Sequence, residues 1–225
     1  MRNRNPRRAF TIIELVIVIV VIGILAATIV PRMDRDLKME AADNILSAIR
    51  YTQHLALTDD KHMFNNVLWQ RRYWRIYFGT CNAGNNSYFY AIGSDDDMTG
   101  SDNARVEQTE AAVDPATQKP YWWQDGVDCS NGGDGTASPS IFISYLYGID
   151  NITASDGGPL HIAFDRLGRP HRGSNFSNSG APDYSGYMSN SITFTFHLKS
   201  GDSFQIVVEP ETGYAYLVGT RLQNL

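Results

Sequence analysis

The first thirty residues constrain this chain more than any other stretch. Four arginines precede position 10, and residues 10–30 then form an apolar run whose only charge is Glu14. These 21 residues extend about 31 Å as an α-helix, enough to cross a hydrocarbon core of about 30 Å. The sequence therefore predicts a membrane-spanning helix over residues 10–30, and the arginines before it predict a cytoplasmic N-terminus.

Three kinds of membrane segment compete for this run. A secretory signal peptide has a shorter apolar region, of about 7 to 15 residues, followed by a small-residue cleavage site. A plain signal anchor explains the length and the arginines but not Glu14, because a carboxylate inside a bilayer costs roughly 2.5 to 3.5 kcal/mol. The third kind is an anchor that is cut before the apolar run and in which Glu14 pairs with an opposite charge.

The third interpretation is supported by a local motif, AFTIIEL at residues 9–15. This string resembles the processing site of type IV pilins and type II secretion pseudopilins. The resemblance implies that prepilin peptidase cuts between Ala9 and Phe10 and that the new amino group of Phe10 is methylated. It also implies that Glu14 neutralises the N-terminus of a neighbouring subunit, since paired charges cost far less than lone ones in an apolar medium. The family usually has glycine before the cut, where this chain has Ala9.

Helical periodicity continues beyond the membrane segment. Pro31 predicts a kink rather than an end to the helix. Apolar residues then recur every three or four positions, with an interruption at Thr52 and Gln53. We expect this stripe to pack on a soluble domain; its members are Met39, Ala42, Ile45, Leu46, Ile49 and Ala56.

The rest of the chain changes to strand patterning. Short segments of β-branched and aromatic residues alternate with stretches rich in Gly, Asn, Ser and Asp, which predicts an antiparallel sheet with long loops. The expected fold is α+β and pilin-like, with a leader at 1–9, a long helix over 10–62 and a periplasmic β-rich domain over 63–225. The expected strands are 73–78, 87–92, 141–147, 160–164, 192–197, 204–208 and 214–218.

Three further motifs narrow the resemblance: RYTQHLA at 50–56, IAFDRLGRP at 162–170 and VEPETGY at 208–214. They are similar to the GspH/FimT branch of minor pseudopilins, whose closing hairpins carry F-D-x-x-G and P-x-T-G turns. Gly168 and Gly213 can take the positive φ that such turns demand. The resemblance implies a minor pseudopilin of a type II secretion pseudopilus, with a FimT-like minor type IV pilin for pilus assembly, DNA uptake or adhesion as the alternative.

The resemblance also implies partners and a location. The partners are other pilin or pseudopilin subunits, bound through the N-terminal helix, together with prepilin peptidase and an inner-membrane assembly platform. The location is the bacterial inner membrane, in a single pass, with the C-terminal domain in the periplasm and the subunit in a filament after assembly. A stationary membrane-anchored binding domain is a third interpretation, and it predicts an uncleaved N-terminus.

Charge makes nucleic acid an unexpected partner. The full chain carries −5, and without the four leader arginines 15 Lys and Arg face 24 Asp and Glu, a balance of −9. Phosphate neutralisation needs clustered Lys and Arg. A basic patch around Arg71, Arg72 and Arg75, which stand among aromatics, would favour DNA. An amphipathic strand with solvent-facing or acid-paired arginines is the simpler interpretation.

Two cysteines and one acidic stretch carry the remaining site predictions. Cys81 and Cys129 would lie in an oxidising compartment and are expected to pair, with two free buried thiols as the alternative. Asp95, Asp97, Thr99 and Gly100 resemble the first half of an EF-hand loop, and the candidate calcium ligands of this stretch are Asp95, Asp97 and Asp102. Its twelfth position is a valine where calcium needs a bidentate Glu, so a solvated acidic turn is expected and calcium is the alternative.

Neither catalysis nor a cofactor is expected. The five histidines are dispersed without metal-ligand spacing, and no nucleophile-elbow pattern is present. The aromatic segment 121–123 is open to two interpretations, an exposed contact surface or a plug over the sheet.

Overall fold

The long amphipathic pattern forms one helix. The computed structural model describes residues 11–59, 69, 72–81, 87–94, 96, 106–172 and 186–219, with the backbone alone for residues 26–36. Helix α1 (Ile12–Thr58) continues through Pro31, so the proline does not end it. Internal contacts divide the chain into two units, Met1–Leu37 and Lys38–Leu225. The kink at Pro31 stays a prediction.

One face of α1 is buried from Lys38 onward. Its buried residues recur every three or four positions, as a helix that packs on one side requires. Thr52, which interrupts the apolar pattern, belongs to this face because its buried hydroxyl donates to the Ala48 carbonyl at 2.8 Å. Met39, expected in the stripe, is instead 42% exposed. The buried set is Ala41, Ala42, Ile45, Ala48, Ile49, Thr52 and Ala56.

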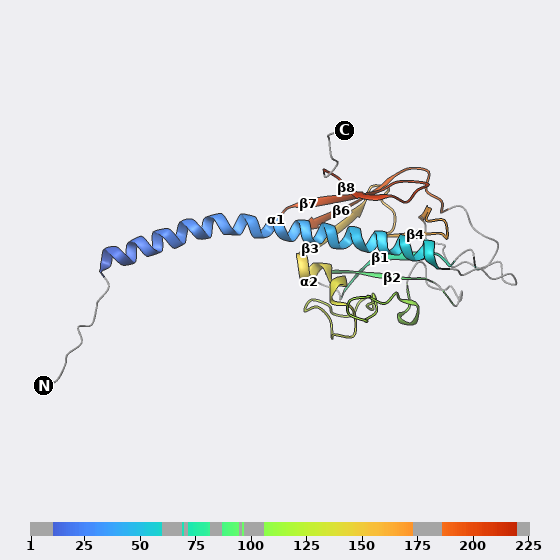
Figure 1. Ribbon diagram of the computed structural model, residues 1–225, viewed down its shortest axis with the longest axis horizontal. Helices are drawn as coiled ribbons and strands as arrows, with labels where there is room; N and C mark the ends of the chain where they lie inside the picture. Colours follow the sequence, from blue (N-terminus) through green and yellow to red (C-terminus); the bar gives the residue numbers. More distant parts are fainter. Residues whose placement is uncertain are drawn as a thin grey trace. The chain divides into compact units, whose positions relative to one another are not determined.

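The strands confirm the α+β prediction but form two antiparallel sheets among the described residues instead of one. The first has the order β2-β1-β4-β5 and the second the order β3-β6-β7-β8. In Figure 1, β6, β7 and β8 lie on one side of the second half of α1, and β1 and β2 lie on the other. The first sheet comprises β1 (Trp74–Thr80), β2 (Tyr88–Ser94), β4 (His161–Phe164) and β5 (Pro170–His171). The second comprises β3 (Ile149–Ala154), β6 (Ile192–Leu198), β7 (Ser203–Val208) and β8 (Ala215–Leu217).

The outer edge of β2 is covered by loop backbone, which explains why the first sheet stops there. The Ile92 amide donates to the Tyr121 carbonyl at 2.9 Å, and the Ile92 carbonyl accepts from the Ala112 amide at 2.8 Å. This loop backbone occupies the edge that another strand would use. The two sheets meet through side chains, since the Phe78 ring contacts those of Phe194 and Phe196 at centroid distances of 5.9 and 5.3 Å.

The strand predicted over 141–147 is wrong. The chain there forms a short 3-10 helix, η3 (Pro139–Ile141), followed by α2 (Ile143–Tyr147). Pro139 opens η3, where its fixed φ is pre-organised and its missing N–H is not needed. Gly148 ends α2 in the left-handed conformation with a φ of 73°. The strand begins immediately afterwards, at Ile149.

Helix α1 is tied to both sheets at two turns. The Gln53 side-chain amide donates both of its hydrogens, to the Gly168 carbonyl at 2.9 Å and to the Thr212 carbonyl at 2.7 Å. The two turns are in close contact. Gly213 leaves no room for a side chain, since a Cβ atom there would lie 2.5 Å from the Gly168 carbonyl oxygen. One side chain therefore satisfies a carbonyl in each of the two turns that resemble GspH/FimT proteins.

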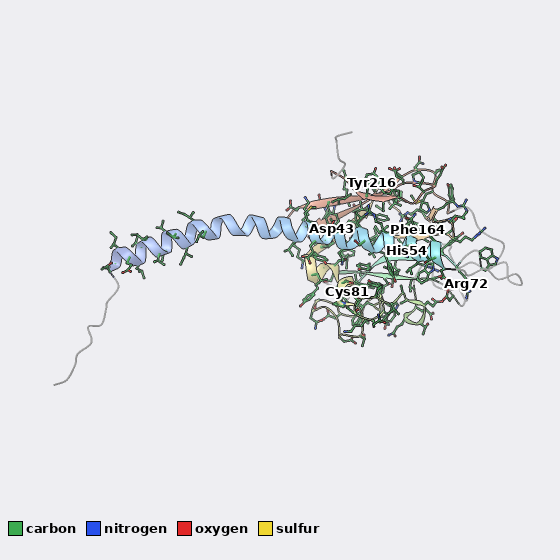
Figure 2. The ribbon with its side chains drawn as sticks, viewed as in Figure 1. Asp43, His54, Arg72, Cys81, Phe164 and Tyr216 are labelled. Carbon is green, nitrogen blue, oxygen red and sulfur yellow. A yellow bond between two sulfur atoms is a disulfide. The ribbon has the colours of Figure 1, made fainter. Side chains whose placement is uncertain are left out.

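We expect Gln53→Ala to lower the free energy of unfolding by about 1 to 2 kcal/mol, since the partly buried Gly168 carbonyl and the exposed Thr212 carbonyl both lose their donor. Thermal unfolding of the purified chain measures this as a fall in Tm of a few degrees. The matched control is His54→Ala, because His54 is the next residue and its side chain is exposed (Figure 2). Equal losses in the two variants would contradict the role of the Gln53 amide.

Candidate functional site

The first part of α1 carries an apolar surface on all sides. Every large apolar side chain from Ile12 to Leu25 is between 45% and 84% exposed. A helix that is apolar all round is normally covered by lipid or by other protein. This stretch of the first unit is therefore the candidate site for anchoring and assembly.

Among the residues that the structure describes, no helix is both long enough and apolar enough to cross a membrane.

Glu14 is the one charged residue within this apolar surface. It lies in the first turn of α1, where the helix dipole favours a negative charge. Its backbone amide donates to the Thr11 hydroxyl at 3.3 Å, which satisfies one of the free N–H groups at the helix start. Within the described part of the chain its carboxylate has no hydrogen-bond or ion-pair partner, so it is available to a group from another molecule.

Several predicted site residues lie outside the described residues. These include both sides of the expected cleavage, Ala9 and Phe10, and the three aspartates of the acidic stretch, Asp95, Asp97 and Asp102. Among the described residues no group of three His, Cys, Asp or Glu side chains gathers as metal ligands.

The two cysteines form a disulfide in the structure. Cys81 follows β1 and Cys129 lies in the loop after the 121–123 aromatics, with a Cα–Cα distance of 5.6 Å (Figure 2 labels Cys81). Their sequence separation is 48 residues. Closing a loop of this length stabilises the fold by about 4 kcal/mol in the chain-entropy account. The bridge holds the long central loop, residues 106–138, to the first sheet.

The structure describes two of the three arginines of the basic patch that would favour DNA, Arg72 and Arg75. Arg75 is fully buried within β1. Arg72 is half-buried, and its guanidinium donates to the Asp96 carbonyl. Arg71 lies outside the described residues. Because Arg75 is buried, it does not contribute to a surface patch with Arg71 and Arg72.

Asp165 is the electrostatic centre of the turn between β4 and β5. One carboxylate oxygen accepts from the backbone amides of Leu167 and Arg169, at 2.9 and 3.0 Å. The other accepts from the Arg169 guanidinium at 2.7 Å and lies 3.2 Å from His171 Nε2. Burial alone would raise the pKa of Asp165, but these hydrogen bonds outweigh it and hold the pKa at about 2. The sequence marked the F-D-x-x-G turn but not His171, which is buried and stacks on Tyr73.

Comparison with known proteins identifies the N-terminal segment. Residues 4–30 match the family model of the prokaryotic N-terminal methylation motif. No curated protein and no solved structure matches the chain. The matched motif is the prepilin signal of type IV pilins and pseudopilins, and the matched range includes Ala9, Phe10 and Glu14. The chain thus carries a prepilin signal and fits a pilin-like superfamily, in agreement with its long helix and antiparallel sheets.

The lowered pKa of Asp165 predicts how the stability of the fold changes at acid pH. Because the folded pKa, about 2, lies below the ordinary value of 3.8, the ionised carboxylate stabilises the fold above pH 3.8. That stabilisation is lost as the pH falls through about 2. We expect Asp165→Asn to be less stable than the parent at pH 7 and to show a weaker further loss between pH 4 and 2, in urea unfolding at a series of pH values.

The control for this experiment is Asp202→Asn. Asp202 is exposed in the turn between β6 and β7, so its variant should follow the parent at every pH. An Asp165→Asn curve parallel to the parent curve would contradict the prediction.

Proposed function

We propose that this chain is a minor pseudopilin that works by assembly and not by catalysis. The observation that carries the proposal is the prepilin signal at residues 4–30, together with an exposed apolar helix surface whose one charge is Glu14. In this proposal the precursor is held in the inner membrane by its helix, with the leader in the cytoplasm and the β-rich domain in the periplasm. Prepilin peptidase removes residues 1–9 and the amino group of Phe10 is methylated.

The proposed assembly step uses the two features of the first unit together. The apolar side chains from Ile12 onward leave the lipid and pack against the helices of neighbouring subunits. The carboxylate of Glu14 pairs with the N-terminal amine of a neighbour. Burying a lone charge in this apolar setting costs several kcal/mol, so an arrangement that pairs the two charges is favoured over one that does not.

The choice of a secretion pseudopilus rests on the GspH/FimT-like motifs. The turns at Gly168 and Gly213 meet through Gln53, so these motifs act as one unit in the fold. The acidic body and the buried Arg75 count against a pilus subunit that captures DNA. A minor type IV pilin is the alternative that the experiments below separate.

Replacing Glu14 by Gln should separate processing from assembly. We expect the leader to be removed normally, because the bond between Ala9 and Phe10 is unchanged, and we expect the subunit to be absent from the sheared filament fraction. Mass spectrometry of the N-terminal peptide and immunoblotting of that fraction measure the two results. Asp43→Asn is the matched control, since Asp43 is an exposed acid on the same helix outside the signal (Figure 2). Normal incorporation of Glu14→Gln, or an intact Met1 leader in the parent, would overturn the proposal.

Secretion by a clean deletion strain distinguishes the two pilin-like systems. We expect a set of exported proteins to disappear from the medium and to accumulate in the periplasm, and we expect complementation to restore them. Quantitative proteomics of both fractions measures this. An unchanged secretome would reject the type II secretion role and favour the type IV pilus, with DNA uptake and adhesion as the next assays.

A further inference from the structure

A groove of about 350 Å³ lies beside β1 and the loops that follow β2. Three described parts of the chain form it: Tyr77 from β1, the start of the 3-10 helix η2 (Gln108–Glu110) with the two residues before it, and residues 122–125. These loops are drawn in green in Figure 1. The described residues that line it are Tyr77, Val106, Glu107, Gln108, Trp122, Trp123, Gln124 and Asp125.

The floor of the groove is aromatic and fixed in place. Tyr77 and Trp123 are buried, and Trp122 is half-buried. The indole N–H of Trp122 donates to the Val106 carbonyl at 2.7 Å, and that of Trp123 donates to the Val127 carbonyl at 3.2 Å. Both indole N–H groups therefore already donate to backbone carbonyls. What the two indoles present to a ligand is the apolar surface of their rings.

The groove is held in shape by the surrounding fold. The disulfide between Cys81 and Cys129 and the hydrogen bond from the Gly126 amide to the Thr80 carbonyl, 3.1 Å long, fix the loop against the end of β1. The Trp123 ring packs edge-on against Phe142 at a centroid distance of 5.2 Å. A pre-formed site does not lose affinity to the ordering of its own side chains.

The rim offers neutral hydrogen-bonding groups. Gln108 and Gln124 are exposed, and within the described part of the chain their side-chain amides have no protein partner. Each amide carries both a donor and an acceptor. The side chain of Glu107 is already used to cap η2. Among the lining residues that the structure describes there is no Lys, Arg or His, and the carboxylates of Glu107 and Asp125 repel anions.

We propose that this groove binds a neutral saccharide. A sugar ring has an apolar C–H face that suits the aromatic floor, and its hydroxyls both donate and accept, as the two glutamine amides do. A concave site with apolar walls and a few convergent polar groups is the usual form of a small-ligand site. This proposal is independent of the assembly role, because none of the groove residues belongs to the N-terminal helix.

The test uses the full chain, purified in a detergent without a sugar headgroup. The probes are maltotriose, cellotriose and triacetylchitotriose, titrated to about 10 mM, with saturation-transfer NMR and tryptophan fluorescence as readouts. Phosphate and choline at the same concentration represent anionic and cationic ligands. We expect at least one trisaccharide to bind and phosphate and choline not to bind.

Variants locate the binding. Gln108→Ala and Gln124→Ala remove exposed amides without disturbing the core, and each should weaken binding about tenfold. Trp122→Ala should abolish it, and its Tm shows whether the variant is folded. Tyr145→Ala is the matched control, because Tyr145 is 56% exposed and lies outside the groove.

Three results would overturn the proposal. They are the absence of binding by all three trisaccharides, binding that survives both glutamine substitutions unchanged, and binding of choline or phosphate that is stronger than that of any sugar.

Discussion

Burial of one face of α1 between the two sheets is the interaction on which the globular unit depends. The apolar core joins residues of this helix face with residues of both sheets in one continuous cluster. The same helix also supplies polar contacts, since Arg50 donates to the Ala215 carbonyl at the edge of the second sheet and Gln53 donates to the Gly168 and Thr212 carbonyls. Because an unpaired buried carbonyl is costly, a helix that satisfies these groups fixes its own position and register on the sheets.

The two parts of α1 are built for different surroundings. From Lys38 onward the helix is amphipathic, and its apolar face is buried within its own unit. From Ile12 to Leu25 it exposes apolar side chains in every direction and carries the unpartnered carboxylate of Glu14. Within the described chain, neither the apolar surface nor the charge of this first part has a partner. The prepilin signal in the same stretch supports the proposed process, removal of a leader followed by association with other subunits.

The long central loop has little regular structure but is well held. The Asp114 carboxylate accepts hydrogen bonds from the Ala116 amide at 2.9 Å and from the Thr117 and Ser138 hydroxyls at 2.8 and 2.6 Å. Burial would raise the pKa of Asp114, but these hydrogen bonds lower it overall. Together with the disulfide and the pairing to the edge of β2, they let a loop without strands present a fixed groove.

The sequence by itself determined the features that depend on local pattern. The prepilin signal, the helix through Pro31, the α+β class and most strands follow from charge, period and short motifs. The tertiary structure decided what a local pattern leaves open, because a polar side chain can be buried and a short apolar run can form either a helix or a strand. Thr52 joins the buried face through its bond to Ala48, Arg75 is enclosed within β1, and the apolar run 141–147 became helical where periodicity alone could not separate helix from strand. The groove forms where β1 contacts two loop segments that are distant from it in the sequence, and no local sequence pattern predicts such a contact.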